Sequence, residues 1–291
     1  MTATSPKSFA AFILTHGRPN QVITYDTLRK AGYTGDIYLI IDNEDKTADD
    51  YYRIYGTDKV IMFDKKAAGE TFDIADTRTD RRATVYARNA SFDIAKRLGL
   101  EYFMQLDDDY NGFRFRSYSK ETDHFESISI KSLDKVFTAM IELLDKTKAK
   151  SIALSQGGDW IGGTGSHAAR EPLMRKCMNS WLFRTDTPVK FIGRMNDDVN
   201  TYTVYGSRGD LFFTCSAVQL DAIPTQKGAG GMTEMYLDTG TYMKSFYTVM
   251  MLPSCVTVRP MGGATFHRLH HHVKWGYAVP KIISDQHRKP R

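Results

Sequence analysis

The sequence predicts an α/β fold: a single Rossmann-type domain in which helices flank a central, mostly parallel sheet. Three observations support this prediction. Short apolar runs alternate with segments of helical periodicity through the first hundred residues, which is the pattern of successive βαβ units. The second half mixes both kinds of element. No linker, repeat or low-complexity stretch divides the 291 residues, so we expect one domain over residues 1–291.

The first half is expected to contain four buried strands, at residues 9–14, 37–41, 59–63 and 101–106. Helices should lie between them. Pro19 suits the first turn of one helix, a short charged helix should follow residue 45, and a third should cover residues 81–98, where Gly99 ends it. Residues 64–80 are polar and irregular, so no element is predicted there.

The second half shows a less regular pattern. Alternating apolar and polar side chains from Phe113 to Tyr118 indicate a half-exposed strand. We expect helices at 131–148 and 232–250, and strands at 151–154 and 210–218. The glycine-rich loop at 157–165 matches neither common phosphate-binding motif. A loop that closes over a ligand and a plain surface loop both remain open interpretations.

Composition narrows the function classes only slightly. The net charge of +5 is compatible with a polyanionic partner but does not require one. The three cysteines, which are far apart and form no CxxC pair, are expected to be free thiols and not a zinc site. No apolar run is long enough for a membrane span and no signal peptide precedes residue 9, so we expect a cytoplasmic protein without a membrane partner.

The strongest chemical signal is the triplet Asp107, Asp108 and Asp109, directly after a predicted buried strand. Open parallel sheets bind ligands beyond the carboxyl ends of their strands. On an extended segment Asp107 and Asp109 would face one point and Asp108 another. Two carboxylates suit Mg²⁺ or Mn²⁺, with a diphosphate completing the shell. An acidic turn that caps a strand is the alternative, but the buried strand leading into the triplet favours the metal site.

A second acidic pair, Asp197 and Asp198, precedes a predicted helix. It either places acid at the positive end of the helix dipole or supplies a general base for an acceptor hydroxyl, and the local sequence leaves both open. Histidines cluster later in the chain, where consecutive side chains cannot all face one ligand. His267 is the first choice for a third metal ligand and His270 the second, with phosphate contact as the competing use.

Together these motifs resemble the GT-A type of nucleotide-sugar glycosyltransferase. The resemblance lies in Thr15–Pro19 after the first strand, Asp42 after the second, Ala87–Asn89 on the third helix, the acidic triplet, and Asn196–Asp198. It implies that residues 1–110 bind the nucleotide sugar and residues 111–291 the acceptor. The donor-binding residues it implies are Thr15, Arg18, Asp42 (near the nucleobase), Arg88, Asp107, Asp108 and Asp109. It further implies a metal site of Asp107, Asp109 and His267, with Asp198 or its neighbour Asp197 as the catalytic base.

More narrowly, the sequence resembles the TET-associated glycosyltransferases of bacteriophages. The similar segments are Leu106–Tyr110, Met195–Val199 and Phe266–His270. This resemblance implies transfer of a hexose or N-acetylhexosamine from a UDP-sugar, with Mn²⁺ or Mg²⁺, to hydroxymethylcytosine in phage DNA within the host cytoplasm. The candidate phosphate contacts are Arg114, Arg116, Lys120, Arg170, Arg175, Lys176 and the basic tail 287–291. A basic tail is more often a solvated terminus, and Trp160, Trp181 and Trp275 are more often buried than stacked on a base.

Three alternatives remain. A glycan or a protein side chain could supply the acceptor hydroxyl in place of DNA. A nucleotidyltransferase is disfavoured, because the loop after the first strand is short and holds one glycine. A non-catalytic DNA-binding module of the same fold is disfavoured because a binder of polyanions gains nothing from clustered acid. A direct displacement would invert the anomeric centre, and the sequence leaves retention open. Neither the sugar nor the oligomeric state follows from the sequence.

Overall fold

The computed structural model describes residues 8–75, 79, 81–119, 121–122, 124–160, 165–166, 176–177, 179–223, 232–261, 268–280, 282–283 and 285–288. Its strands are β1 (Phe9–Leu14), β2 (Asp36–Asp42), β3 (Val60–Phe63), β4 (Tyr102–Asp107), β5 (Tyr110–Ser119), β6 (His124–Ser129), β7 (Ser151–Gln156), β8 (Ser180–Arg184), β9 (Phe212–Ala222), β10 (Val256–Met261) and β11 (Arg268–Val273). The α-helices are α1 (Ile23–Lys30), α2 (Ala48–Tyr55), α3 (Lys65–Gly69), α4 (Val85–Arg97), α5 (Leu133–Thr147), α7 (Asp197–Ser207), α8 (Met232–Met251) and α9 (Trp275–Ala278). Within the described residues, short 3-10 turns cover Pro19–Gln21, Gly157–Trp160 and Asp285–His287.

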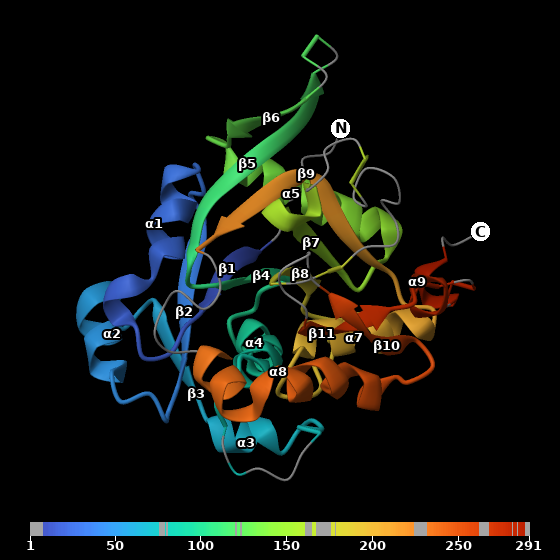
Figure 1. The fold of residues 1–291 in the computed structure, drawn as a ribbon. Helices are drawn as coiled ribbons and strands as arrows, with labels where there is room; N and C mark the ends of the chain where they lie inside the picture. Colours follow the sequence, from blue (N-terminus) through green and yellow to red (C-terminus); the bar gives the residue numbers. More distant parts are fainter. Residues whose placement is uncertain are drawn as a thin grey trace.

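One large sheet organises the molecule, with its strands in the order β3-β2-β1-β4-β8-β7-β9-β5-β6 (Figure 1). Strands β1 to β4 pair in parallel, and β7 pairs in parallel with β9. Strand β8 is antiparallel to β4 and β7, and β5 is antiparallel to β9 and β6. All the strands of this sheet except β5 and β8 therefore run in one direction, which confirms the predicted mostly parallel sheet.

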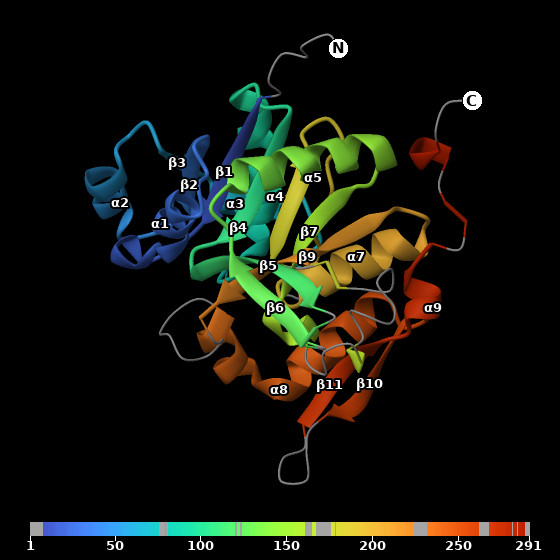
Figure 2. The same ribbon diagram turned by 90° about the horizontal axis from the view of Figure 1, so that it is seen from above.

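Helices cover both faces of this sheet, so the domain has three layers. One buried cluster joins the sheet to α1, α2 and α5 through side chains such as Leu28, Tyr51 and Phe137. A second cluster joins the opposite face to α4 and α7, with Phe92 and Tyr202 among its members. Figure 2 shows α5 on one side of the sheet and α8 with the β10–β11 ribbon on the other. The β5 and β6 hairpin projects beyond the rest of the sheet (Figure 1).

Several elements differ from the sequence prediction. The helix expected to open at Pro19 is divided into a 3-10 turn and α1, because Val22 between them has non-helical angles (φ −81°, ψ 69°). Helix α3 lies in the segment where no element was predicted, and the Asp64 carboxylate caps it by accepting from Ala67 N. Helix α4 begins at Val85 and not at residue 81, and Leu98, the last residue of the predicted span, is its C-cap and is 38% exposed. Strands β6, β8, β10 and β11 were not predicted.

The end of the chain folds back onto the domain. His287 is buried, with its Nε2 atom 2.9 Å from Asp210 Oδ1, and its Nδ1 atom donates to the Lys148 carbonyl. Arg288 pairs with Asp285. These two members of the predicted basic tail are therefore held by the protein, and residues 289–291 lie outside the described part. None of the described helices has both the length and the apolarity of a bilayer span. All three cysteines are free, as expected.

Helices α7 and α9 approach so closely that a glycine is required between them. A Cβ atom at Gly206 would lie 2.2 Å from the Ala278 carbonyl oxygen, whereas one at Gly276 would meet nothing within 4 Å. We expect Gly206→Ala to lower the free energy of unfolding by about 1–3 kcal/mol, because the backbone clash outweighs the gain of about 1 kcal/mol in helix propensity. Gly276→Ala is the matched control and should be neutral or slightly stabilising. Urea unfolding of both variants tests this, and equal effects would contradict it.

Candidate active site

The ends of three parallel strands bring the predicted donor residues to one edge of the sheet. In the strand register, Leu14 of β1 pairs with Ile40 of β2 and with Asp107 of β4. Thr15, Asp42 and Asp107 therefore come at or just after the carboxyl ends of neighbouring strands. This is the edge where open parallel sheets bind ligands.

Asp108 holds the loop that follows β1. Its side chain is buried and accepts hydrogen bonds from Thr15 Oγ1 (2.6 Å) and from the Arg18 guanidinium (2.8 Å). The Tyr51 hydroxyl lies 2.9 Å from Thr15 Oγ1 and accepts from the Arg18 backbone N–H. Burial raises the pKa of Asp108, while Arg18 and Thr15 oppose this shift. Thr15 Oγ1 and one terminal nitrogen of the Arg18 guanidinium are thus engaged within the protein, whereas Arg18 Nε has no hydrogen-bond partner in the described part of the chain.

The acidic triplet is not extended throughout, contrary to the geometry assumed from sequence. Strand β4 ends at Asp107, and Asp108 and Asp109 form a turn before β5. Thr24 Oγ1 holds this turn by donating to the Asp107 carbonyl (2.7 Å) and accepting from Tyr110 N–H (2.9 Å). Side chains therefore alternate between the two faces of the strand only up to Asp107. Asp108 nevertheless faces the interior, while the Asp107 side chain is 26% exposed.

Arg88 joins this edge to the second acidic pair. Its guanidinium is buried and lies 3.6 Å from Asp107 Oδ1 and 3.3 Å from Asp197 Oδ2. Burial by itself lowers the pKa of Arg88, but the two carboxylates outweigh it and raise the pKa above its usual value. The guanidinium therefore stays charged. It links a residue of β4 to a residue of α7 across the domain core.

The pKa values of Asp107 and Asp197, the carboxyl groups beside Arg88, are raised well above their usual value. Burial raises the pKa of Asp107 to about 6, with Asp109 and Asp198 adding to the shift and Arg88 opposing it. Burial likewise raises the pKa of Asp197, and Asp198 and Asp107 reinforce this shift. Clustered, partly desolvated acids of this kind are characteristic of functional sites.

The acidic pair forms the first turn of α7, and both side chains are buried. The acid therefore lies at the positive end of the helix dipole, which was one of the two interpretations left open. Asn196 precedes the helix in the left-handed region (φ 52°), and its amide donates to Lys244 O (2.7 Å) and Thr248 Oγ1 (3.1 Å) of α8. These bonds position the start of α7 against α8.

Asp42 is the centre of a third polar cluster. Its Oδ2 atom accepts from His16 Nδ1 (2.8 Å) and Lys65 Nζ (3.2 Å), and its Oδ1 atom accepts from Glu44 N–H (3.1 Å). Burial favours a higher pKa for Asp42, but His16 and Lys65 outweigh it and lower the pKa. Neither His16 nor Lys65 was predicted to be a site residue. Lys65 gave no signal, because it belongs to a segment without predicted structure and becomes buried through α3.

The expected third metal ligand, His267, lies outside the described residues. Within the described part, no three His, Cys, Asp or Glu side chains gather in a way that could hold a metal. His270, the second choice, lies in β11, and its Nδ1 atom donates to the His271 carbonyl at 2.7 Å. Asp107 and Asp109 are thus the described members of the predicted ligand set.

Most candidate nucleic-acid contacts that the structure describes have partners within the protein. Arg114 pairs with Asp221, and Arg116 Nε donates to Gln219 Oε1 at 2.7 Å. Trp181 is fully buried and Trp275 stacks on Tyr202, in agreement with the structural interpretation of tryptophan. The positions of Lys120, Arg170 and Arg175 and the side chain of Trp160 lie outside the described part.

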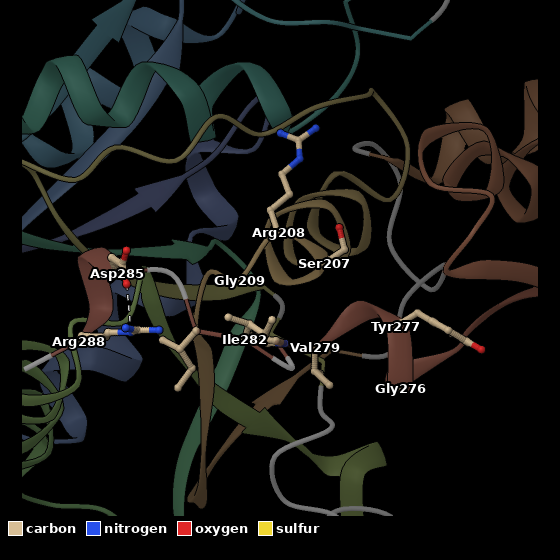
Figure 3. Close-up of a pocket in the computed structure, with 11 residues that line it drawn as sticks. Ser207, Arg208, Gly209, Gly276, Tyr277, Val279, Ile282, Asp285 and Arg288 are labelled. Carbon is tan, nitrogen blue, oxygen red and sulfur yellow. Dashed lines mark ion pairs between the residues drawn. The ribbon is translucent and has the colours of Figure 1, made fainter.

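A cavity of about 530 Å³ lies at the opposite end of α7 from the acidic pair. Figure 3 shows Arg208, Tyr277, Val279 and Ile282 around it, with Asp285 and Arg288 forming an ion pair at one side. Helix α7 has 11 residues and is therefore roughly 16 Å long. The cavity contains none of the predicted site residues. The candidate site is therefore placed at the acidic end of the helix, where the reactive groups are.

Comparison with known proteins identifies one family. The model of the TET-Associated Glycosyltransferase family matches residues 9–231, a span that holds all of the predicted site residues except His267. Comparison with curated protein sequences returns no match.

Solved structures that are similar to this chain include glucosyl-3-phosphoglycerate synthase from Mycobacterium tuberculosis. Its complex with Mn²⁺, uridine diphosphate and phosphoglyceric acid is 8% identical, with a TM-score of 0.47, over 92% of this chain and 87% of that chain. Its complex with Mn²⁺ and uridine-diphosphate-glucose is also 8% identical, with a TM-score of 0.48, over 92% and 87% of the two chains.

Removing the guanidinium from the acidic cluster should destabilise the fold. We expect Arg88→Met to lower the free energy of unfolding by about 3–5 kcal/mol, because it leaves buried carboxylates without their partner. Arg53→Met, which breaks an exposed pair with Asp50, is the control and should change it by about 0.5 kcal/mol or less. Adding Asp197→Asn to Arg88→Met should recover part of the loss. Equal losses for the two single variants in urea unfolding would refute this role of Arg88.

Proposed function

Because the chain belongs to the family of TET-associated glycosyltransferases, we propose that it transfers a sugar from a nucleotide-diphosphate donor to hydroxymethylcytosine in DNA. The observation that carries this proposal is the ion-paired bridge from Asp107 through Arg88 to Asp197. The bridge joins the sheet edge expected to bind the donor to the helix that carries the expected base. One site thereby contains groups for both substrates.

The donor's diphosphate is assigned to the edge formed by β1, β2 and β4. Asp107 and Asp109 offer carboxylate oxygens there, the donor type that Mn²⁺ and Mg²⁺ prefer, and the exposed part of Asp107 leaves it accessible. These residues therefore fit a divalent cation, with His267 retained as the proposed third ligand. The cation would offset the negative charge that develops on the leaving diphosphate. A UDP-sugar is the proposed donor.

Arg88 is assigned an electrostatic and positioning role. Its side chain is only 4% exposed, so it acts on the diphosphate through its charge and by orienting Asp107. Asp108 is assigned to the support of the β1 loop, because both of its oxygens accept hydrogen bonds from that loop. Thr15 and Arg18 shape the donor site through the same contacts.

Asp198 is the better candidate for the general base. Asp197 is paired with Arg88, whereas Asp198 Oδ1 accepts a hydrogen bond from the Val199 N–H at 2.8 Å, and its charge contributes to the raised pKa of Asp107. In the proposed reaction Asp198 takes the proton of the acceptor hydroxyl. The hydroxyl oxygen then bonds to the anomeric carbon as the bond from that carbon to the diphosphate oxygen breaks. This direct displacement inverts the anomeric centre.

The proposed acceptor rests on the family. The hydroxymethyl group of a modified cytosine faces the major groove in an intact duplex, and a flipped base would bring it closer to buried groups such as Asp198. A glycan or a protein side chain would offer the same hydroxyl chemistry, so the acceptor has to be tested directly.

A transfer assay tests the whole proposal. The protein is incubated with Mn²⁺, a panel of nucleotide sugars, and duplex DNA with or without hydroxymethylcytosine, and the digested nucleosides are analysed by mass spectrometry. We expect a hexose or N-acetylhexosamine on the modified base only, and none with the Asp107→Ala, Asp109→Ala double variant. Donor hydrolysis with unmodified DNA would reject the DNA acceptor. Absence of any donor consumption would favour a non-catalytic binding module.

Replacing the proposed base should reduce turnover while donor binding is retained. We expect Asp198→Asn to lower kcat about 10²- to 10⁴-fold, because a positioned general base contributes a factor of that size. Asp49→Asn, which changes an exposed carboxylate in the first turn of α2, is the matched control and should leave kcat unchanged. Steady-state kinetics and calorimetric titration with UDP separate the two effects. A full loss of UDP affinity in a folded Asp198→Asn protein would assign Asp198 to the donor site instead.

A further inference from the structure

We infer that His16 contacts the nucleoside-diphosphate part of the donor through its Nε2 atom, and that Asp42 acts by holding His16 for this contact. The inference rests on the proposed nucleotide-sugar site and adds a binding residue to it. Four observations support it. The His16 side chain is exposed, its neighbours in the loop hydrogen bond within the protein, both carboxylate oxygens of Asp42 already accept hydrogen bonds, and charged groups surround the ring.

In the loop after β1, from Thr15 to Arg18, His16 has a more exposed side chain than Thr15 and Arg18. Thr15 Oγ1 is hydrogen-bonded to Asp108 and Tyr51, and the Arg18 guanidinium donates to Asp108. Gly17 N–H donates to Asp45 Oδ2 at 2.7 Å. The His16 side chain, by contrast, is 51% exposed, and no residue in the described part of the chain hydrogen bonds its Nε2 atom.

The ring is also held in a defined orientation. Its Nδ1 atom lies 2.8 Å from Asp42 Oδ2 and 3.8 Å from Asp45 Oδ2, so Nδ1 carries the proton and donates to Asp42. Nε2 is the ring nitrogen left for a ligand. Because β1 and β2 end beside each other, His16 stands at the carboxyl edge of the sheet, next to the predicted donor site.

Asp42 itself has little capacity left for a nucleobase. Its Oδ2 atom accepts from His16 and Lys65, its Oδ1 atom accepts from Glu44 N–H, and its side chain is 6% exposed. A direct contact with the base would have to displace or share these bonds. The resemblance placed Asp42 near the nucleobase, and the geometry assigns that contact to the histidine it holds.

The surrounding charges set the sign of the pH dependence. The charged groups that face His16 are Asp42 of β2, Asp45 after it and Lys65 of α3; nearby, Glu44 pairs with Arg81. The hydrogen bond to Asp42 raises the pKa of His16, while burial and Lys65 oppose it. The doubly protonated ring is therefore favoured relative to a free histidine. Its Nε2–H donates to a ligand oxygen, so nucleotide affinity should fall as pH rises through the pKa of His16.

Two substitutions test the roles of the two His16 ring nitrogens separately. In His16→Asn the amide nitrogen can replace Nδ1 as donor to Asp42, but no atom remains at the Nε2 position. His16→Gln places an amide nitrogen near the Nε2 position and loses the Nδ1 contact. Asn20→Ala, an exposed change close to the loop, is the control. UDP affinity is measured by calorimetry in the presence of Mg²⁺ from pH 6 to pH 8.5, and thermal unfolding confirms that each variant is folded.

We expect His16→Asn to bind UDP about tenfold more weakly at pH 6, which corresponds to the loss of one charge-assisted hydrogen bond. The difference from the wild type should shrink toward pH 8.5, because the neutral ring no longer donates from Nε2. His16→Gln should bind UDP more tightly than His16→Asn at pH 8.5, since its amide donates at every pH. Asn20→Ala should match the wild type throughout.

A second measurement does not depend on the variants. Nuclear magnetic resonance of the histidine rings in the wild-type protein, titrated with and without UDP, should show one ring whose pKa rises on UDP binding. Equal UDP affinity of His16→Asn and wild type at pH 6, or no histidine pKa that changes with UDP, would overturn the inference. If the wild type binds neither UDP, GDP nor dTDP with Mg²⁺ or Mn²⁺, the proposed donor site itself fails, which is a different outcome.

Discussion

A buried guanidinium is costly unless its charge is compensated, and at the centre of the domain Arg88 is compensated by carboxylates. It lies within 3.6 Å of Asp107 from β4 and of Asp197 from α7. Helix α4, which carries Arg88, also carries Asn89. The Asn89 side-chain amide forms two hydrogen bonds with the backbone of Phe191, just before α7. Helix α4 therefore determines where the second half of the chain meets the sheet edge. The position of Asp198 relative to the predicted donor site follows from this arrangement.

The acidic residues of the candidate site are of two kinds: buried residues that support a loop, and partly exposed residues at the sheet edge. The burial of each side chain and its hydrogen-bond partners decide which kind it is. Asp108 and Asp42 are nearly inaccessible, and each holds part of the loop after β1 through short hydrogen bonds. Asp107 keeps part of its surface exposed at the sheet edge. Residues that look equivalent in the triplet thus have different surroundings, because β4 ends at Asp107 and a turn follows. The loop they support presents His16 on its outer side.

The fold was predictable where a segment has one clear period. Strands β1, β2, β4 and β7 are buried apolar runs, and α5 has an apolar stripe, so each was located within a few residues. Strand β8 was missed, and its pairing with β4 and β7 is what makes it a strand. Strands β10 and β11 depend on each other and on α8, and α3 is a five-residue helix. Local patterns carry little information about elements whose structure depends on contacts with distant parts of the chain.

The sequence by itself determined the order of the four strands and of the helices between them except α3 in the first half, the family, and the residue types at the carboxyl ends of β1, β2 and β4. These features are local, since a buried strand must be apolar and ligand-binding groups must follow it. Only the tertiary structure decided that Arg88 joins Asp107 to Asp197, that Asp108 supports a loop, and that Lys65 and His16 meet at Asp42. Each of these contacts joins residues at least 19 positions apart in the chain. No periodicity in the sequence encodes such a pairing, because it arises from the packing of whole strands and helices against one another.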